Sequence, residues 1–185
     1  MPAYLDTVNT IFALGVIFLQ VVTLFLLANL IFFRNPANKV LNFFSRYTFI
    51  IGFLISFGAV SVSLFYSDVI GFPPCELCWI QRIFLYPQLV FYTMEFFKKD
   101  KSIVDFSLVF AILGTIVSIY HVYIENGGES SLPCAQNVVG QVSCATRYVY
   151  EFGYITIPMM ALTLSFALIV IILNYKYISR NTTAQ

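Results

Sequence analysis

Five long apolar stretches limit what this chain can fold into. Each approaches or exceeds the roughly 20 residues that an α-helix needs to cross about 30 Å of hydrocarbon. The stretches cover residues 11–33, 48–72, 79–97, 106–124 and 154–175. With 59% hydrophobic and 10% charged residues, the chain also has too little polar surface to solvate a globule. The sequence therefore predicts an all-α, polytopic protein of the lipid bilayer with five spans.

The first stretch could be mistaken for a signal peptide that is removed after export. Its N-terminal flank has no basic residue and carries Asp6. Its apolar run is also longer than the roughly 7–15 residues of a typical signal-peptide core. We expect this stretch to be retained as a span.

Basic residues gather on one side of the five-span arrangement. Because Lys and Arg in short loops favour the cytoplasmic side, we expect the N-terminus outside and the C-terminus inside. The net charge of +1 indicates neither nucleic acid nor an acidic partner. Eight of the ten Lys and Arg residues lie in the loops after the first and third stretches or in the tail, namely Arg34, Lys39, Arg46, Lys98, Lys99, Lys101, Lys176 and Arg180.

All four cysteines lie in or beside the two loops assigned to the outer side. Cys75 and Cys78 form a Cys-x-x-Cys pair before the third stretch, and Cys134 and Cys144 lie in the loop at 125–153. An extracytoplasmic setting permits disulfides that the cytosol would reduce. Three interpretations stay open: a disulfide staple beside a small apolar or metal-clip pair, a zinc site, and a redox dithiol.

The zinc interpretation is the weakest, because nine residues separate Cys134 from Cys144. A zinc knuckle has about two to four, and we expect no metal. A redox dithiol needs a thiolate at a helix start, where backbone N–H groups and the helix dipole stabilise negative charge. Cys78 is placed at such a start.

Arg82 and His121 are the candidates for a bound electron acceptor. Arg82 follows Cys78 by four residues and shares its helix face, so it could stabilise a thiolate and polarise a carbonyl oxygen. The alternative is that it extends to the lipid headgroups. His121 reaches the same depth and could donate a proton to a reduced acceptor. Taken alone, it would be a hydrogen-bonded packing residue.

Other residues carry structural expectations. Arg147 is expected to contact lipid headgroups. Gly52 and Gly58 are small enough to permit close helix approach. Aromatic residues near the outer span ends are expected to anchor the chain at the interface, namely Tyr66, Trp79, Tyr120, Tyr123 and Tyr154.

These residues together resemble the bacterial disulfide-bond oxidoreductases DsbB and BdbC. The resemblance covers roughly residues 47–175 and rests on CELCWIQR at 75–82, followed by His121, Cys134 and Cys144. The segment CATRY at 144–148 is close to the short-loop BdbC form. The ordered set of pair, arginine, histidine and second pair on one membrane face is specific, whereas a lone Cys-x-x-Cys would not be.

The resemblance implies a bacterial cytoplasmic-membrane enzyme that passes electrons from a thioredoxin-fold thiol oxidase to a quinone. It implies that the partner attacks Cys134 to form a mixed disulfide, which Cys144 helps to resolve. Cys75 would then exchange with this second pair, and Cys78 would face the quinone. Arg82 and His121 would flank the quinone ring. The sequence does not distinguish ubiquinone from menaquinone.

The resemblance also divides the chain. Residues 1–46 would form an extra N-terminal transmembrane helix and a cytoplasmic loop, 47–178 the DsbB-like four-helix bundle, and 179–185 a cytoplasmic tail. The extra span and the short loop between Cys134 and Cys144 depart from the usual family pattern. Two alternatives remain: a vitamin K epoxide reductase-like enzyme, in which the shuttle cysteines normally precede the active pair, and a disulfide-stapled membrane scaffold without activity.

Overall fold

The computed structural model describes residues 4–33, 35, 37–98, 101–129, 134 and 142–183. These residues form helices and no strand, apart from one isolated bridge between Glu151 and Ile155. The elements are α1 (Tyr4–Phe32), α2 (Lys39–Arg46), α3 (Thr48–Leu64), the π-helical turn η1 (Phe65–Val69), α4 (Glu76–Lys98), α5 (Lys101–Glu125) and α6 (Ile157–Thr183). The prediction of an all-α fold is confirmed.

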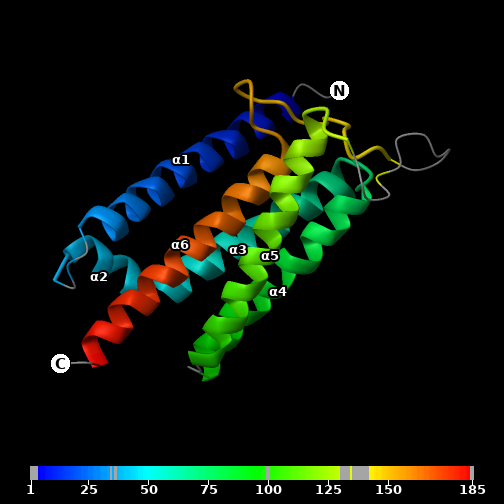
Figure 1. Cartoon of the computed structure of the whole chain (residues 1–185). Helices are drawn as coiled ribbons and strands as arrows, with labels where there is room; N and C mark the ends of the chain where they lie inside the picture. Colours follow the sequence, from blue (N-terminus) through cyan, green and yellow to red (C-terminus); the bar gives the residue numbers. More distant parts are fainter. Residues whose placement is uncertain are drawn as a thin grey trace.

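Helix α6 lies at the centre of the bundle. It packs against α1, α2, α3 and α5, and α4 lies between α3 and α5. Ala167, Leu168 and Ile172 of α6 are completely buried. Figure 1 shows that α1 begins at one end of the bundle and α6 finishes at the other. An odd number of crossings produces this arrangement.

Among the described residues, four helices are long and apolar enough to cross a membrane: α1, α3 with η1, α5 and α6. Helix α4 has 23 residues, or about 35 Å of helix. It is less apolar because Gln81 and Gln88 lie within it, and both are buried against α5. Gln81 donates to the Ser118 hydroxyl and Gln88 to the Ser107 carbonyl. All five stretches expected to span are therefore helices, and the polar residues of α4 turn inward.

A π-helical turn closes the second span. The α-helical pattern of α3 ends at Leu64, and η1 follows over Phe65–Val69. Gly71 then adopts a φ of +82°, a conformation that costs glycine little. Inserted π turns shift the side chains that follow them and are frequent at functional sites. Here Tyr66 is turned into the protein and is 3% exposed.

Close approach of α3 and α4 depends on one glycine. A Cβ atom at Gly52 would lie 2.2 Å from the buried Tyr92 ring, so only glycine fits without a shift. This prediction is confirmed. The same expectation for Gly58 is wrong, because a Cβ there would meet nothing within 4 Å.

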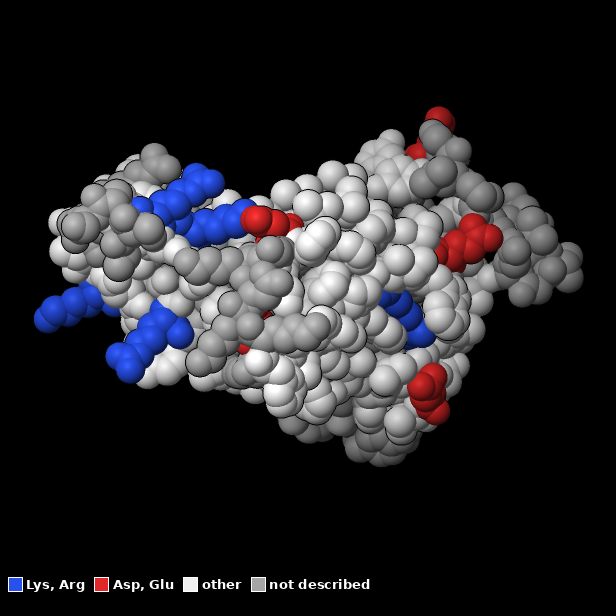
Figure 2. Space-filling model, turned by 90° about the horizontal axis from the view of Figure 1, so that it is seen from below, with Lys and Arg blue, Asp and Glu red and all other residues white. Residues whose placement is uncertain are grey.

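Charged side chains separate along the bundle. Figure 2 shows most of the visible Lys and Arg gathered at one end and most of the visible Asp and Glu toward the other. An exception is the ion pair between Lys176 of α6 and Asp105 of α5. This separation agrees with the orientation expected from the loop charges. The orientation itself, with the N-terminus outside, stays a prediction.

Candidate active site

The Cys75–Cys78 dithiol is built by the start of α4. Cys75 directly precedes the helix, and its sulfur accepts a hydrogen bond from the Cys78 backbone N–H at 3.3 Å. The two sulfur atoms lie 2.7 Å apart and are not bonded to each other. A disulfide bond is about 2.05 Å long, so closing it requires only a small movement. The pair is therefore arranged for reversible oxidation.

Helix-dipole stabilisation falls on Cys75. The sequence indicated Cys78 as the sulfur stabilised at the helix start. In the structure, the backbone N–H of Cys78, in the first turn of α4, donates a hydrogen bond to the Cys75 sulfur instead. The hydrogen bond from the Cys78 thiol is the main cause that lowers the pKa of Cys75 to about 5; burial opposes it, and His121 adds to it. At neutral pH the reduced pair therefore carries its negative charge on Cys75.

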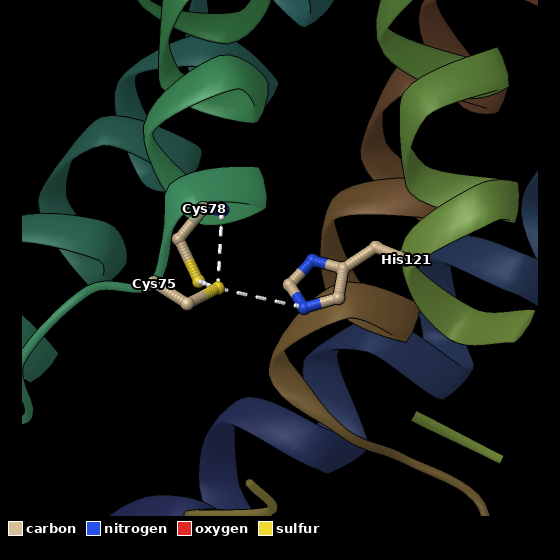
Figure 3. Close-up of side chains that lie close together, drawn as sticks. All are labelled: Cys75, Cys78 and His121. Carbon is tan, nitrogen blue, oxygen red and sulfur yellow. Dashed lines mark hydrogen bonds between the residues drawn. The ribbon is translucent and has the colours of Figure 1, made fainter. Parts of the chain in front are cut away.

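His121 faces the dithiol from α5, as Figure 3 shows. Its Nε2 atom lies 3.7 Å from the Cys75 sulfur and 3.3 Å from the Cys144 carbonyl oxygen. Its Nδ1 atom lies 3.2 Å from Gln81 Oε1, and Gln81 is held in turn by Ser118. The imidazole is 2% exposed. It is thus oriented by Gln81 and can exchange a proton with Cys75.

The second cysteine pair forms a disulfide close to the first. Cys134 and Cys144 are bonded, with 5.7 Å between their Cα atoms. Both are buried in one cluster with Cys75, Leu77 and Ile124, which Cys78 also contacts. All four cysteines therefore meet at one end of the bundle, as electron transfer between the pairs requires. Most of the residues between Cys134 and Cys144, on which the short-loop expectation falls, lie outside the described residues.

A zinc cage of four thiolates does not form in this structure, because Cys134 and Cys144 are bonded to each other. The potential ligand atoms of Cys75, Cys78 and His121 lie within 4.8 Å of one another. They could hold a soft metal ion only while both cysteines are reduced, since metal ligation needs thiolates. The expectation of no metal stays a prediction.

A cavity of about 100 Å³ opens beside Cys78 between α3, α4 and α6. Its volume compares with the roughly 150 Å³ cavity that is known to hold benzene, so it is on the scale of one aromatic ring. The walls are mostly apolar, and Cys78, Gln81 and Arg82 supply polar atoms. The cavity thus offers one sulfur atom, one cation and apolar walls. This combination suits a planar, apolar molecule that carries a carbonyl oxygen.

Arg82 is held in place at this cavity. Its Nε donates to the Ser63 hydroxyl at 3.0 Å and its Nη2 to the Ser63 carbonyl at 3.2 Å. Its guanidinium carbon lies 5.0 Å from the centre of the Trp79 ring and 6.0 Å from that of Tyr86. These contacts fix the guanidinium group against α3 beside the cavity. Arg82 and His121 do not line the same cavity, since His121 lies on the Cys75 side of the dithiol.

Three aromatic residues that sequence reasoning did not connect form one wall of the cavity. The Tyr66 ring stacks on Phe72 with 6.0 Å between centres, and Phe72 stacks on Tyr148 at 4.6 Å. All three line the cavity beside Cys78. The anchoring role expected for Tyr66 is wrong, because the ring is buried. Trp79 is 56% exposed, in keeping with an interfacial position.

A smaller cavity of about 30 Å³ lies on the other side of the dithiol, lined by Cys75, His121 and Glu125 among others. It has room for one water molecule. Glu125 is buried, accepts a hydrogen bond from the Thr156 hydroxyl, and lies 4.0 Å from Arg147 Nε. Arg147 also donates to the Glu125 carbonyl and Asn126. It therefore ties the loop to the end of α5, where a headgroup contact was expected.

The sequence contains only weak signals for the site residues that it did not predict, namely Glu125, Gln81 and Tyr66. Glu125 follows His121 by four residues, a spacing that places both on one helix face. Gln81 follows Cys78 by three residues, and it too shares that residue's face of the helix. No local sequence pattern predicts the π-helical turn that directs Tyr66 into the protein.

Comparison with known proteins places this site in a family. The family model "Disulfide bond formation protein DsbB" matches residues 45–175. A probable disulfide formation protein C 1 of Bacillus anthracis is 39% identical over 107 residues, which are 58% of this chain and 76% of the relative.

Two further relatives extend the comparison. The SPbeta prophage-derived disulfide bond formation protein B of Bacillus subtilis (strain 168) is 38% identical over 121 residues, 65% of this chain and 79% of the relative. A probable disulfide formation protein of Chlamydia pneumoniae is 34% identical over 140 residues, which are 75% of this chain and 98% of the relative. No solved structure matches. Because the family match includes both cysteine pairs, the chain belongs to the DsbB family of membrane disulfide oxidoreductases.

Proposed function

We propose that the protein reoxidises a thioredoxin-fold thiol oxidase and passes the electrons through its two cysteine pairs to a membrane quinone. The observation that carries this proposal is the position of the Cys75–Cys78 dithiol. Cys75 is buried in one cluster with the Cys134–Cys144 disulfide, and Cys78 lines the cavity beside Arg82. The dithiol thus connects a disulfide that can receive electrons to a cavity that fits a planar acceptor.

The first exchange takes place at the Cys134–Cys144 disulfide. A thiolate of the reduced partner attacks Cys134 and forms a mixed disulfide while Cys144 leaves as a thiolate. The second partner thiol then releases Cys134, so the partner becomes oxidised and the Cys134–Cys144 pair reduced. The Cys144 carbonyl contacts His121, which places this half of the pair next to the dithiol.

The second exchange transfers the reducing equivalents to Cys75 and Cys78. A thiolate of the outer pair attacks Cys75 in the Cys75–Cys78 disulfide, and closure of Cys134–Cys144 leaves both inner cysteines reduced. Cys78 leaves in the first of these two steps. Cys75 leaves when Cys134–Cys144 closes, and its lowered pKa favours that departure. His121 exchanges the proton at the Cys75 sulfur.

Reoxidation of the dithiol needs an acceptor of two electrons, and a quinone fills this role when it is converted to a quinol. The quinol takes one of its two protons from the Cys78 thiol and the other from solvent, because Cys75 is already a thiolate. Cys78 faces this acceptor, and Arg82 places a fixed positive charge at the cavity. The Cys75 thiolate then bonds to the Cys78 sulfur, which lies 2.7 Å away.

We also propose the bacterial cytoplasmic membrane as the location, with both cysteine pairs on the extracytoplasmic side, because this compartment lets disulfides persist. The vitamin K epoxide reductase-like alternative has the opposite order of cysteine pairs. The scaffold alternative expects a stable disulfide between Cys75 and Cys78 that a quinone does not affect, which the experiment below tests.

Quinone reduction by the purified protein tests the proposal. The protein, in lipid nanodiscs, receives a reduced thioredoxin-fold oxidase and either a ubiquinone or a menaquinone analogue. Wild type is expected to reduce at least one of them, and Cys78→Ser and Cys134→Ser to reduce neither. Cys144→Ser is also expected to reduce neither, because without Cys144 the outer disulfide that the partner thiolate attacks cannot form. Failure of wild type with both quinones, while its disulfides stay intact, would reject the proposal and favour the scaffold.

A further inference from the structure

Helix α1 lies outside the family match, which starts at residue 45, yet it packs against residues that line the cavity beside Cys78. Its N-terminal half contributes Ala13 and Val16 to an apolar cluster that also contains Tyr66 and Met160. Tyr66 and Met160 also line the cavity beside Cys78. An element that the family pattern does not contain therefore supports the wall of the site.

One buried hydrogen bond makes this support specific. The Tyr66 hydroxyl donates to Asn9 Oδ1 at 2.9 Å, and the two residues are 3% and 6% exposed. Phe12, one turn further along α1, meets the Tyr66 ring edge-on, with 5.9 Å between centres and 76° between planes. Helix α1 thus contacts both the polar end and the edge of the same side chain.

The position of Tyr66 determines the position of the whole aromatic wall. Its ring is nearly parallel to Phe72, at 8°, and Phe72 is nearly parallel to Tyr148, at 17°. Stacked rings of this kind move together, because each offers its face to the next. A displaced Tyr66 would alter the surface on which a planar molecule lies.

The Asn9–Tyr66 bond is hard to replace inside a membrane protein. A buried polar group that loses its partner cannot turn to water, so the remaining group carries the full cost of desolvation. Tyr66 also comes from the π turn η1, where the backbone departs from regular α-helical spacing. The bond from α1 fixes a side chain that the π turn alone would not hold in one place.

We propose that α1 is a positioning element for the electron acceptor, and that Asn9 acts through its hydrogen bond to Tyr66 to fix the aromatic wall of the cavity. Asn9 is a positioning residue, since its Oδ1 accepts a hydrogen bond from Tyr66 and Tyr66 lines the cavity beside Cys78. The proposal rests on the function proposed above, because it concerns the affinity of the same cavity for a quinone.

The test measures KM and kcat for a soluble quinone analogue with the full chain in nanodiscs. Asn9→Leu removes the acceptor oxygen, and Tyr66→Phe removes the donor but keeps the ring. Each is expected to raise the KM for quinone by about threefold to tenfold, the effect of losing one hydrogen bond, with kcat nearly unchanged. The double variant is expected to be no worse than either single variant, because both remove one interaction.

Thr10→Ala is the matched control. Thr10 adjoins Asn9 in α1, but its hydroxyl donates to the Asp6 carbonyl of its own helix. It is expected to leave KM unchanged. Oxidation of the reduced partner without quinone, at one turnover per molecule, is expected to be equal in all variants, which separates cavity affinity from disulfide exchange and from misfolding.

The outcomes separate the two proposals. Absence of quinone reduction by wild type would reject the proposed function itself. If wild type is active and Asn9→Leu and Tyr66→Phe have the same KM as Thr10→Ala, the role of α1 is rejected while the function stands. Additive effects in the double variant, or a loss of the quinone-free exchange, would also reject it, since either shows general structural damage.

Discussion

His121 Nε2 lies 3.7 Å from the Cys75 sulfur, while Nδ1 of the same ring faces Gln81 Oε1. An amide oxygen only accepts hydrogen bonds, so Gln81 keeps a proton on Nδ1. Nε2 is then the nitrogen that gains or loses a proton next to Cys75. The histidine and the thiol form a pair whose shared proton can follow the redox state of the dithiol.

Replacing His121 by leucine is expected to raise the pKa of Cys75 above its value of about 5. The rise should be partial, because the hydrogen bond from Cys78 is the larger cause of the lowering. Ultraviolet absorbance of the thiolate, followed against pH in a Cys134→Ser/Cys144→Ser background, measures the change. Thr115→Ala is the control, since its hydroxyl bonds only to the Ala111 carbonyl of α5. An unchanged titration would show that His121 does not act on Cys75.

The reduction potential of the Cys75–Cys78 couple is expected to depend weakly on pH. The hydrogen bond from the Cys78 thiol lowers the pKa of Cys75, so above that pKa its sulfur stays a thiolate and reduction takes up about one proton instead of two. For a two-electron couple this gives a fall of about 30 mV per pH unit, against about 59 mV for an ordinary dithiol. Equilibration with glutathione buffers measures the slope. A slope near 59 mV would contradict the lowered pKa.

Ser63→Ala is expected to raise the KM for quinone with little effect on disulfide exchange. The Ser63 hydroxyl accepts hydrogen bonds from both Arg82 and Tyr86, and its loss frees the guanidinium group at the cavity. One such bond to a charged group is worth about 1.5–3 kcal/mol at most, and the Ser63 carbonyl contact remains. Ser61→Ala on the exposed face of α3 is the control. Equal KM values for both variants would exclude this role.

Gly52→Ala is expected to destabilise the bundle by about 1–3 kcal/mol, the usual cost of overpacking. The added methyl group would meet the buried Tyr92 ring between α3 and α4. Gly58→Ala in the same helix is the control, because its methyl group would meet open space. Thermal unfolding in detergent compares the two. Equal melting temperatures would contradict the close contact at Gly52.

Labelling of single cysteines is expected to confirm the orientation. In a cysteine-free background, Glu129→Cys in the loop after α5 should react with a membrane-impermeant maleimide on intact cells. Asn42→Cys in α2 should react only after permeabilisation. Both residues are exposed in the structure, so access to the reagent is not limited by packing. The reverse pattern would overturn the predicted topology.

The spans and the meeting of the cysteine pairs could be predicted because each depends on a local property. Apolar length fixes a transmembrane helix, and two outer loops of one small bundle have little room to lie apart. The choice between Cys75 and Cys78 could not be predicted. It depends on whether α4 begins one residue before or after the first cysteine, and helix starts are uncertain by one or two residues from sequence.

Side-chain partners were the least predictable part of the site. His121 and Arg82 were placed at one depth, but depth along a helix does not determine which neighbour a side chain faces. Arg147 pairs with Glu125 because the loop after Cys144 folds back onto α5, a tertiary contact that no local pattern contains. Tyr66 differs from the other interfacial aromatic residues only through the π turn, which shifts its direction inward.

The central position of α6 has a consequence for biosynthesis. In the most apolar segment of α6, 61% of the residues are buried, against 22–28% in the other three apolar spans. Helix α6 also contacts α1, α2, α3 and α5. It is also the last helix of the bundle to leave the ribosome. The cavity beside Cys78, to which α6 contributes Met160 and Leu164, is therefore complete only once α6 has been made and has packed against the earlier helices.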